Sequence, residues 1–193
     1  MKKRLLALAL LLFASPAAAD PMVLKDGDVL RGRFVQERFM QGFAKPVRSE
    51  GSFVVVPGHG LIWRAEAPFA VTTVVTPAGL VQSVDGAETT RLAAARLPFL
   101  SRLYDMMGGA LAGDWRALEG TFQVTREPGK VALAPKSKDD PTAAQIAGIT
   151  ARLSRFVDEV EIEKPSGDRD RLRFTDQVLN GGALTPDEAA LLK

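Results

Sequence analysis

The sequence predicts a mainly β (α+β) domain in which ten or eleven antiparallel strands form a curved sheet or an incomplete barrel around one helical insertion. Three observations support this prediction. Short runs of β-branched and aromatic residues recur between turn residues along the chain. One stretch near the middle changes to helical spacing. The 193 residues contain no repeat and no long linker, which is typical of a single domain.

The N-terminus is predicted to be a signal peptide over residues 1–19, which leaves residues 20–193 as the single domain. Three basic residues precede the apolar run Leu5–Ala14, and small residues before Asp20 form a cleavage site. That run is about half as long as a membrane-spanning helix. Cleavage would place a soluble chain in the periplasm and change its net charge from +2 to −1, because the segment carries three basic residues and no acidic ones. We therefore expect no nucleic-acid partner.

The first half of the domain is predicted to be a meander of about six strands. Tight turns join these strands, for example at residues 57–60, and strands joined in this way are antiparallel because parallel pairs need long crossovers. The expected strands are residues 30–39, 51–56, 61–65, 69–76, 80–84 and 87–92.

Helical spacing of apolar residues follows over 91–115. Pro98 divides the stretch, so we expect a short first piece and then a helix from about residue 98 to 112, which ends near Gly113. An open sheet must cover its apolar face, and this helix is the expected cover.

Strand patterns return in the second half. The expected strands are residues 121–126, 131–134, 149–153, 156–164 and 169–175. For residues 149–153, a helix that continues to Arg155 is the alternative. One or two helical turns are expected from Thr142 to Ala147. Near the end, Thr185 and Glu188 form a capping box with Pro186 at the first helical position, which predicts a short terminal helix.

The residue inventory favours binding over catalysis. The chain has no cysteine, which excludes disulfides, thiol catalysis and cysteine zinc sites. Its one histidine, His59, lies between two glycines in a turn, and no G-x-S-x-G nucleophile motif is present. Glu159, Glu161 and Glu163 alternate with apolar residues as on a solvent-facing strand. We expect no metal and no cofactor.

A methionine pair in the helical stretch allows two interpretations. Met106 and Met107 lie on one stripe with Phe99, Leu103, Tyr104 and Leu111. The stripe is either ordinary core or the wall of a ligand cavity, because methionine adapts to ligands of varied shape. The two tryptophans, Trp63 and Trp115, leave the same choice open.

Several short motifs occur in a characteristic order. They are Gly32-Arg33-Phe34-Val35-Gln36, Glu50-Gly51-Ser52-Phe53, Trp63 before Ala67-Pro68-Phe69, the Val84-Asp85-Gly86 turn, the L-x-G-D-W-x-x-L segment from Leu111 to Leu118, and Leu133-Ala134-Pro135-Lys136. In this order the chain resembles the LolA-like outer-membrane lipoprotein carriers, in particular a divergent subgroup. The resemblance implies an open half-barrel of about eleven antiparallel strands with a helical lid over an apolar cavity. It also implies a monomer that carries lipoprotein acyl chains from an inner-membrane exporter to an outer-membrane receptor.

The resemblance also suggests which residues bind the ligand. The expected cavity residues are Phe34, Phe53, Trp63, Val74, Phe99, Leu103, Met106, Met107 and Leu111. Carriers of this family place an arginine before a proline between the second and third strands, where it latches the lid. Here Val56 precedes Pro57, so Arg48 and Arg64 are the candidates for the latch. The cargo could then be a lipoprotein, a glycolipid or a polyene ester.

Two other functions are compatible with the same sequence. One is a periplasmic interaction domain that senses lipid or lipoprotein and signals to a partner. The other is an acyl-ester hydrolase that uses His59 as its base.

Overall fold

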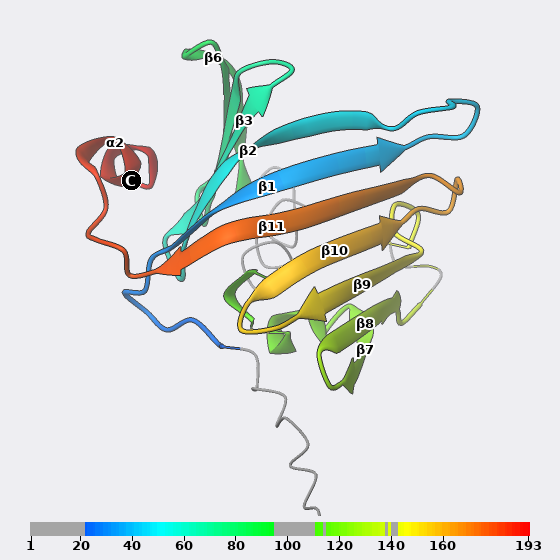
Figure 1. The fold of residues 1–193 in the computed structure, drawn as a ribbon. Coiled ribbons are helices and arrows are strands. Elements are labelled where there is room, and N and C mark those ends of the chain that lie inside the picture. The colour runs from blue at the N-terminus through cyan, green and yellow to red at the C-terminus, as the bar shows by residue number, and fades with distance from the viewer. Residues whose placement is uncertain (1–21, 95–110, 114, 138, 140–142) are drawn as a thin grey trace, which may run out of the picture.

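The computed structural model describes residues 22–94, 111–113, 115–137, 139 and 143–193, and its strands form one curved antiparallel sheet (Figure 1). The predicted fold class is therefore confirmed. The eleven strands of the described residues are β1 (Leu30–Phe39), β2 (Val47–Val56), β3 (Gly60–Ala67), β4 (Val71–Thr76), β5 (Gly79–Val84), β6 (Ala87–Ala93), β7 (Phe122–Glu127), β8 (Lys130–Pro135), β9 (Gly148–Leu153), β10 (Val157–Glu163) and β11 (Arg169–Leu179).

The sheet consists of two meanders that share one seam. Its strand order is β6-β5-β4-β3-β2-β1-β11-β10-β9-β8-β7, so β1 pairs with β11 at the seam. The two outer strands, β6 and β7, follow each other in the chain. The connection between them therefore leads from one edge of the sheet to the other.

The helical predictions have mixed outcomes. The helix expected over residues 98–112 lies outside the described residues except for Leu111 and Ala112, which are helical. A short 3₁₀ helix, η2 (Arg116–Leu118), was not predicted. Residues 143–145 form a turn instead of the expected helical turns, and residues 149–153 are a strand, which removes the helical alternative for them.

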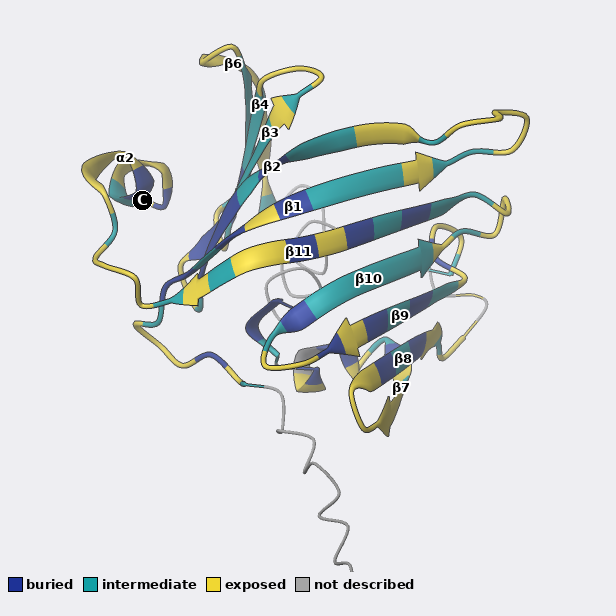
Figure 2. Ribbon diagram, in the orientation of Figure 1, coloured by how far each residue is buried: buried dark blue, intermediate teal, exposed yellow. Residues whose placement is uncertain are grey.

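Burial alternates along the central strands and separates an inner from an outer face (Figure 2). On β11, Leu172 and Phe174 are buried while Arg173 and Thr175 are exposed. The inner face carries a large cluster of apolar residues, which we call the inner cluster; it includes Leu30, Phe34, Phe53, Leu61, Leu133 and Phe174. Because side chains on a strand alternate between faces, this burial identifies the face on which a cavity can form.

The outer face is covered in part by the terminal helix α2 (Pro186–Leu191). A second cluster, the outer cluster, joins sheet residues to the end of this helix; it comprises Val29, Val54, Val56, Ile62, Val74 and Leu192. The predicted capping box is present, with Thr185 Oγ1 accepting from the Glu188 backbone N–H and the Glu188 carboxylate accepting from that of Thr185. Glu188 also pairs with Arg31 on β1 at 2.7 Å, so α2 is tied to the sheet by apolar packing and by charge.

Candidate apolar binding cavity

The inner face contains a cavity of about 340 Å³, a size at the lower end of the range for small-molecule sites. Most of its lining is apolar, and polar groups occur at three positions. The described lining residues are Gln36, Arg38, Trp63, Leu111, Trp115, Leu118, Leu133, Ile146, Ile149, Val160, Ile162, Asp170, Leu172 and Phe174.

Aromatic rings from four strands pack together beside the cavity. Phe34 stacks on Trp63 with ring centroids 3.7 Å apart, although β2 lies between their strands. Phe174 meets Phe53 edge-to-face at 5.5 Å and Trp63 at 6.2 Å. Such edge-to-face and stacked pairs add to the free energy gained by burying the rings.

Two glycines allow close packing around these rings, one against a ring and one against the backbone of β3. Gly51 lies in register between Phe34 and Ala65, and β3 approaches it so closely that a Cβ there would collide with the Arg64 carbonyl oxygen. Gly32 is the β1 partner of Phe53, and a Cβ at this position would lie 2.7 Å from the Phe53 ring. The G-x-F-x-Q and E-G-S-F motifs therefore have a packing role on the inner face.

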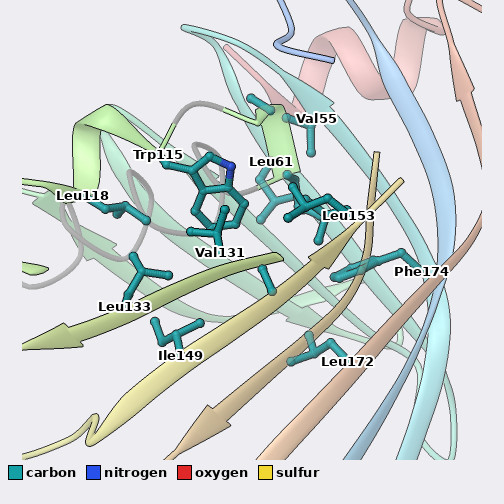
Figure 3. Packing of buried hydrophobic residues seen from close by; sticks show 14 of the residues in the cluster. Val55, Leu61, Trp115, Leu118, Val131, Leu133, Ile149, Leu153, Leu172 and Phe174 are labelled. Carbon is teal, nitrogen blue, oxygen red and sulfur yellow. The ribbon is translucent and has the colours of Figure 1, made fainter. Parts of the chain in front are cut away.

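The opposite wall comes from the second meander and from the segment that precedes β7. Figure 3 shows Trp115 on the side of the sheet onto which Val131, Leu133 and Ile149 project. A backbone hydrogen bond from the Leu24 N–H to the Ala112 carbonyl at 2.8 Å holds the segment to the residues before β1, and within the segment Leu118 donates to the Trp115 carbonyl at 3.2 Å.

One edge of the cavity carries charge. Asp170 is only 6% exposed and accepts a hydrogen bond from Arg38 Nε at 2.8 Å. Its second oxygen lies 2.9 Å from Lys164 Nζ. Two cations thus compensate one buried carboxylate, as burial of a charge requires. Together with Gln36, this group gives an otherwise apolar cavity one polar edge.

A single buried donor in the lining has no partner. In the described residues, the buried side-chain atoms without a hydrogen bond are Trp115 Nε1 and Gln177 Oε1. Gln177 is not among the lining residues, and its amide nitrogen donates to the Val157 carbonyl at 2.8 Å. Trp115 lines the cavity and is 6% exposed, and its Nε1 atom itself is buried.

The sequence matches one family model, described as outer membrane lipoprotein carrier protein LolA-like, over residues 22–183. The chain belongs to this LolA-like family. The match covers all eleven strands and both walls of the cavity. No curated protein matches the sequence.

Solved structures give weaker similarities to the LolA-like chain. A LolA superfamily protein from Nitrosomonas europaea is 10% identical, with 91% of this chain and 94% of that chain covered at a TM-score of 0.44. MucB, in complex with MucA(peri), is 17% identical and has a TM-score of 0.35, with 83% of this chain and 53% of that chain covered. LprF from Mycobacterium bovis is 15% identical and has a TM-score of 0.35, with 82% of this chain and 87% of that chain covered.

The residues expected in the cavity of this LolA-like chain are distributed over four places. Trp63 and Leu111 line the cavity. Phe34 and Phe53 belong to the inner cluster beside it. Phe99, Leu103, Met106 and Met107 lie outside the described residues.

Val74 lies on the other face of the sheet. Its register partner on β3 is Ile62, whose partner on β2 is Val54, and all three belong to the outer cluster. Its neighbour Val75 pairs with Leu61 of the inner cluster instead. The structure thus packs Val74 against the cluster under α2 and away from the cavity.

The two arginines expected to latch the lid also project from the outer face. Arg48 is the register partner of Glu37 on β1 and pairs with Glu50 at 2.8 Å. Arg64 is the neighbour of Ile62 in the alternation along β3, which places it on the same outer face. The latch role stays a prediction. Arg38 is the arginine that the structure places in the described lining.

Sequence reasoning missed most of the second wall and the charged edge. Leu133, Ile149 and Leu172 lie on strands that were predicted, and the alternation of Ile149 and Leu172 with polar residues could have indicated the face on which they lie. Asp170 and Arg38 come from β11 and β1, and no local pattern links positions so distant in sequence.

The remaining candidates for chemistry lie away from the cavity. His59 is exposed in the turn between β2 and β3 and contacts the Pro57 carbonyl through Nδ1 at 3.2 Å. On β10, Glu161 pairs with Arg171 at 3.2 Å and Glu159 with Arg173 at 3.7 Å, while Glu163 is exposed. No group of acidic or histidine side chains in the described part of the chain could hold a metal ion. Nor does that part contain a helix with the length and apolar character needed to cross a membrane.

Proposed function

We propose that the protein is a periplasmic carrier in which residues 1–19 are a cleaved signal peptide and residues 20–193 are the carrier domain, which binds the acyl part of lipoproteins or related lipids and moves them toward the outer membrane. The observation that supports this most strongly is an apolar cavity on the inner face of a chain that belongs to the LolA-like family. Its partners would be an inner-membrane exporter and an outer-membrane receptor.

The apolar lining suits both loading and release of an acyl chain. Each methylene group that leaves water gains about 0.8 kcal/mol, so six buried methylenes contribute roughly 5 kcal/mol. Transfer from the cavity into a bilayer exchanges one apolar environment for another, so the hydrophobic term opposes release to a membrane far less than release to water. A carrier needs this combination of shielding in water and easy transfer to an acceptor.

The site offers no arrangement for catalysis, and we propose that the protein is not an enzyme. His59, the only imidazole in the sequence, does not line the described cavity. A general base must lie within hydrogen-bond distance of the proton that it removes. A ligand on the inner face would therefore be out of reach of the exposed turn that carries His59.

Native mass spectrometry of the protein purified from periplasm without detergent tests the proposal. We expect a polypeptide that begins at Asp20 and carries an adduct, whose fragmentation distinguishes a lipoprotein, a glycolipid and a polyene ester. A transfer assay between donor and acceptor vesicles then distinguishes a carrier from the alternative, an interaction domain that senses lipid or lipoprotein. A carrier passes the adduct to acceptor vesicles, whereas a sensing domain retains it.

Matched variants connect any adduct to the cavity. Leu172→Trp adds bulk to the lining, and Thr175→Trp adds the same side chain to the exposed outer face of the same strand. We expect the first variant to lose the adduct and the second to keep it. If both variants keep the adduct at wild-type occupancy, the ligand binds elsewhere and the proposal is wrong.

A further inference from the structure

We propose that the charged edge of the cavity, formed by Arg38, Lys164 and Asp170, binds an anionic group at the head of a ligand whose chain occupies the apolar part. The anionic group would be a carboxylate or a phosphodiester. The cavity would then prefer an anionic amphiphile to a neutral acyl ester with the same chain. This inference rests on the proposed function and narrows the class of its ligand.

The first argument is that the charged edge and the apolar lining share one face of the sheet. Arg38 on β1 is the register partner of Asp170 on β11, and the next row on this face pairs Gln36 with Leu172. Phe174 lies two residues beyond Leu172, so Asp170 and Phe174 are about 13 Å apart along the strand. Over this length the inner face changes from charged to aromatic, as an amphiphile changes from head to tail.

The second argument is that cations are in excess at this edge and are more accessible than the acid. Arg38 and Lys164 both pair with Asp170, which leaves one uncompensated positive charge. The Asp170 side chain is 9% exposed, against 49% for Arg38 and 30% for Lys164. Asp170 is the one acidic residue of the described lining. Asp168, in the hairpin between β10 and β11, lies outside that lining and accepts from the Gln41 backbone N–H at 2.9 Å.

The third argument is that the Arg38 guanidinium is held in position and still has donors to offer. Its Nε donates to Asp170 Oδ1 at 2.8 Å, which orients the group. In the described part of the chain, the two terminal nitrogens of Arg38 have no hydrogen-bond partner. A guanidinium can bind a carboxylate or a phosphate through two parallel N–H groups, and such charge-assisted pairs are stronger than neutral hydrogen bonds. Asp170 is therefore a positioning residue for Arg38.

The fourth argument concerns which ligand head fits this edge. A neutral ester or amide that covers the edge would displace water from Arg38 and Lys164 and leave their excess charge uncompensated. An anionic head replaces that water with an opposite charge and with acceptors for the free donors. The remaining polar residue of the described lining, Gln36, is neutral and does not oppose an anion.

A competition between a charged and a neutral probe with the same chain tests the inference. The purified protein is equilibrated at pH 8 with an equimolar mixture of palmitate and methyl palmitate and passed through gel filtration, and the retained ratio of palmitate to ester is measured by mass spectrometry. Arg38→Gln removes one cation from the edge. Arg48→Gln is the matched control, because it removes the same charge from the outer face, where Arg48 pairs with Glu50.

We expect Arg38→Gln to lower the palmitate-to-ester ratio by roughly threefold to tenfold relative to wild type, the range for a partly exposed charged pair. Arg48→Gln should leave the ratio unchanged. Asp170→Asn removes the acid and keeps an oxygen that can accept from Arg38 Nε, so it should raise the ratio. Opposite changes at two residues in contact cannot both result from damage to the cavity, and retention of methyl palmitate shows that each variant has folded.

A second pair of probes identifies the source of the anionic group. Palmitoyl lysophosphatidylglycerol and palmitoyl lysophosphatidylcholine share one chain, and only the first has a net negative charge. A preference for the anion that depends on Arg38 in the palmitate pair alone indicates a free fatty acid. The same result in the lysophospholipid pair alone indicates a phosphodiester lipid, and in both pairs it indicates an anionic head of either kind.

Ratios that are the same in wild type and Arg38→Gln for both pairs would overturn the inference, while retention of methyl palmitate would leave the proposed function intact. An equal fall in Arg48→Gln would also overturn it, because the effect would then follow the net charge of the protein. So would a fall in both Arg38→Gln and Asp170→Asn, since the cluster would then act through structure alone. If the wild type retains none of the probes, the proposed function fails as well.

Discussion

Replacement of Glu188 by glutamine should remove a pH-dependent contribution to stability that the terminal helix makes. Glu188 is buried, and its carboxylate accepts from Arg31 Nε at 3.1 Å, from Arg31 Nη2 at 2.7 Å and from the Thr185 backbone N–H at 2.8 Å. The Arg31 guanidinium is the main cause that lowers the pKa of Glu188 from 4.5 to about 2, against the opposing effect of burial.

The direction and size of the effect follow from this pKa. A carboxyl whose pKa is lower in the folded than in the unfolded chain stabilises the fold above the unfolded pKa and loses that stability as the pH falls toward the folded pKa. The difference between 4.5 and about 2 corresponds to at most about 3 kcal/mol at neutral pH. About 2 kcal/mol of this amount is lost between pH 7 and pH 3.

Urea unfolding followed by tryptophan fluorescence at pH 7 and pH 3 measures the effect. Other carboxyls with a lowered pKa, namely Asp28, Glu66 and Glu88, also lose stability in acid, but they are common to both proteins. The gap between wild type and Glu188→Gln should therefore shrink by up to about 2 kcal/mol at pH 3. A gap of the same size at both pH values would refute the assignment of this contribution to the carboxylate.

Three further substitutions test the packing and the function. Gly51→Ala should destabilise the sheet by about 3 kcal/mol, because its Cβ would collide with the Arg64 backbone oxygen; urea unfolding measures this. Phe34→Ala should cost about 3–5 kcal/mol in the same assay, and Phe39→Ala, on the half-buried outer side of β1, should cost less than half as much. His59→Ala should leave lipid binding and turnover of an acyl-ester substrate at wild-type levels; loss of an esterase activity would instead favour the hydrolase.

The strand bounds were predictable where turn residues and apolar–polar alternation within the segment itself mark them. The bounds expected for the first strand match β1, because turn residues and alternation are both clear there. The start of β2 was missed because residues 47–50 are largely polar and are held as strand by pairing with β1. A pattern within one segment contains no information about the partner strand that stabilises it.

The residues that line the cavity were predictable only in part, because the register between strands fixes which side chains project from the inner face of the sheet. Val74 and Val75 are adjacent and both buried, so alternation could not indicate which valine faces inward. Pairing with β3 places Val75 on the inner face and Val74 on the outer face. In the same way, the unpartnered N–H of Trp115 is a property of tertiary packing that no sequence motif expresses.

The seam between β1 and β11 has a consequence for the order of folding. Each meander can grow from hairpins whose strands are neighbours in sequence, which is fast. The seam pairs the first strand with the last, as in the register of Phe39 with Arg169, and closing so long a loop carries a larger entropic cost. A chain exported with its N-terminus first would therefore complete the middle of its sheet last, after β11 has emerged.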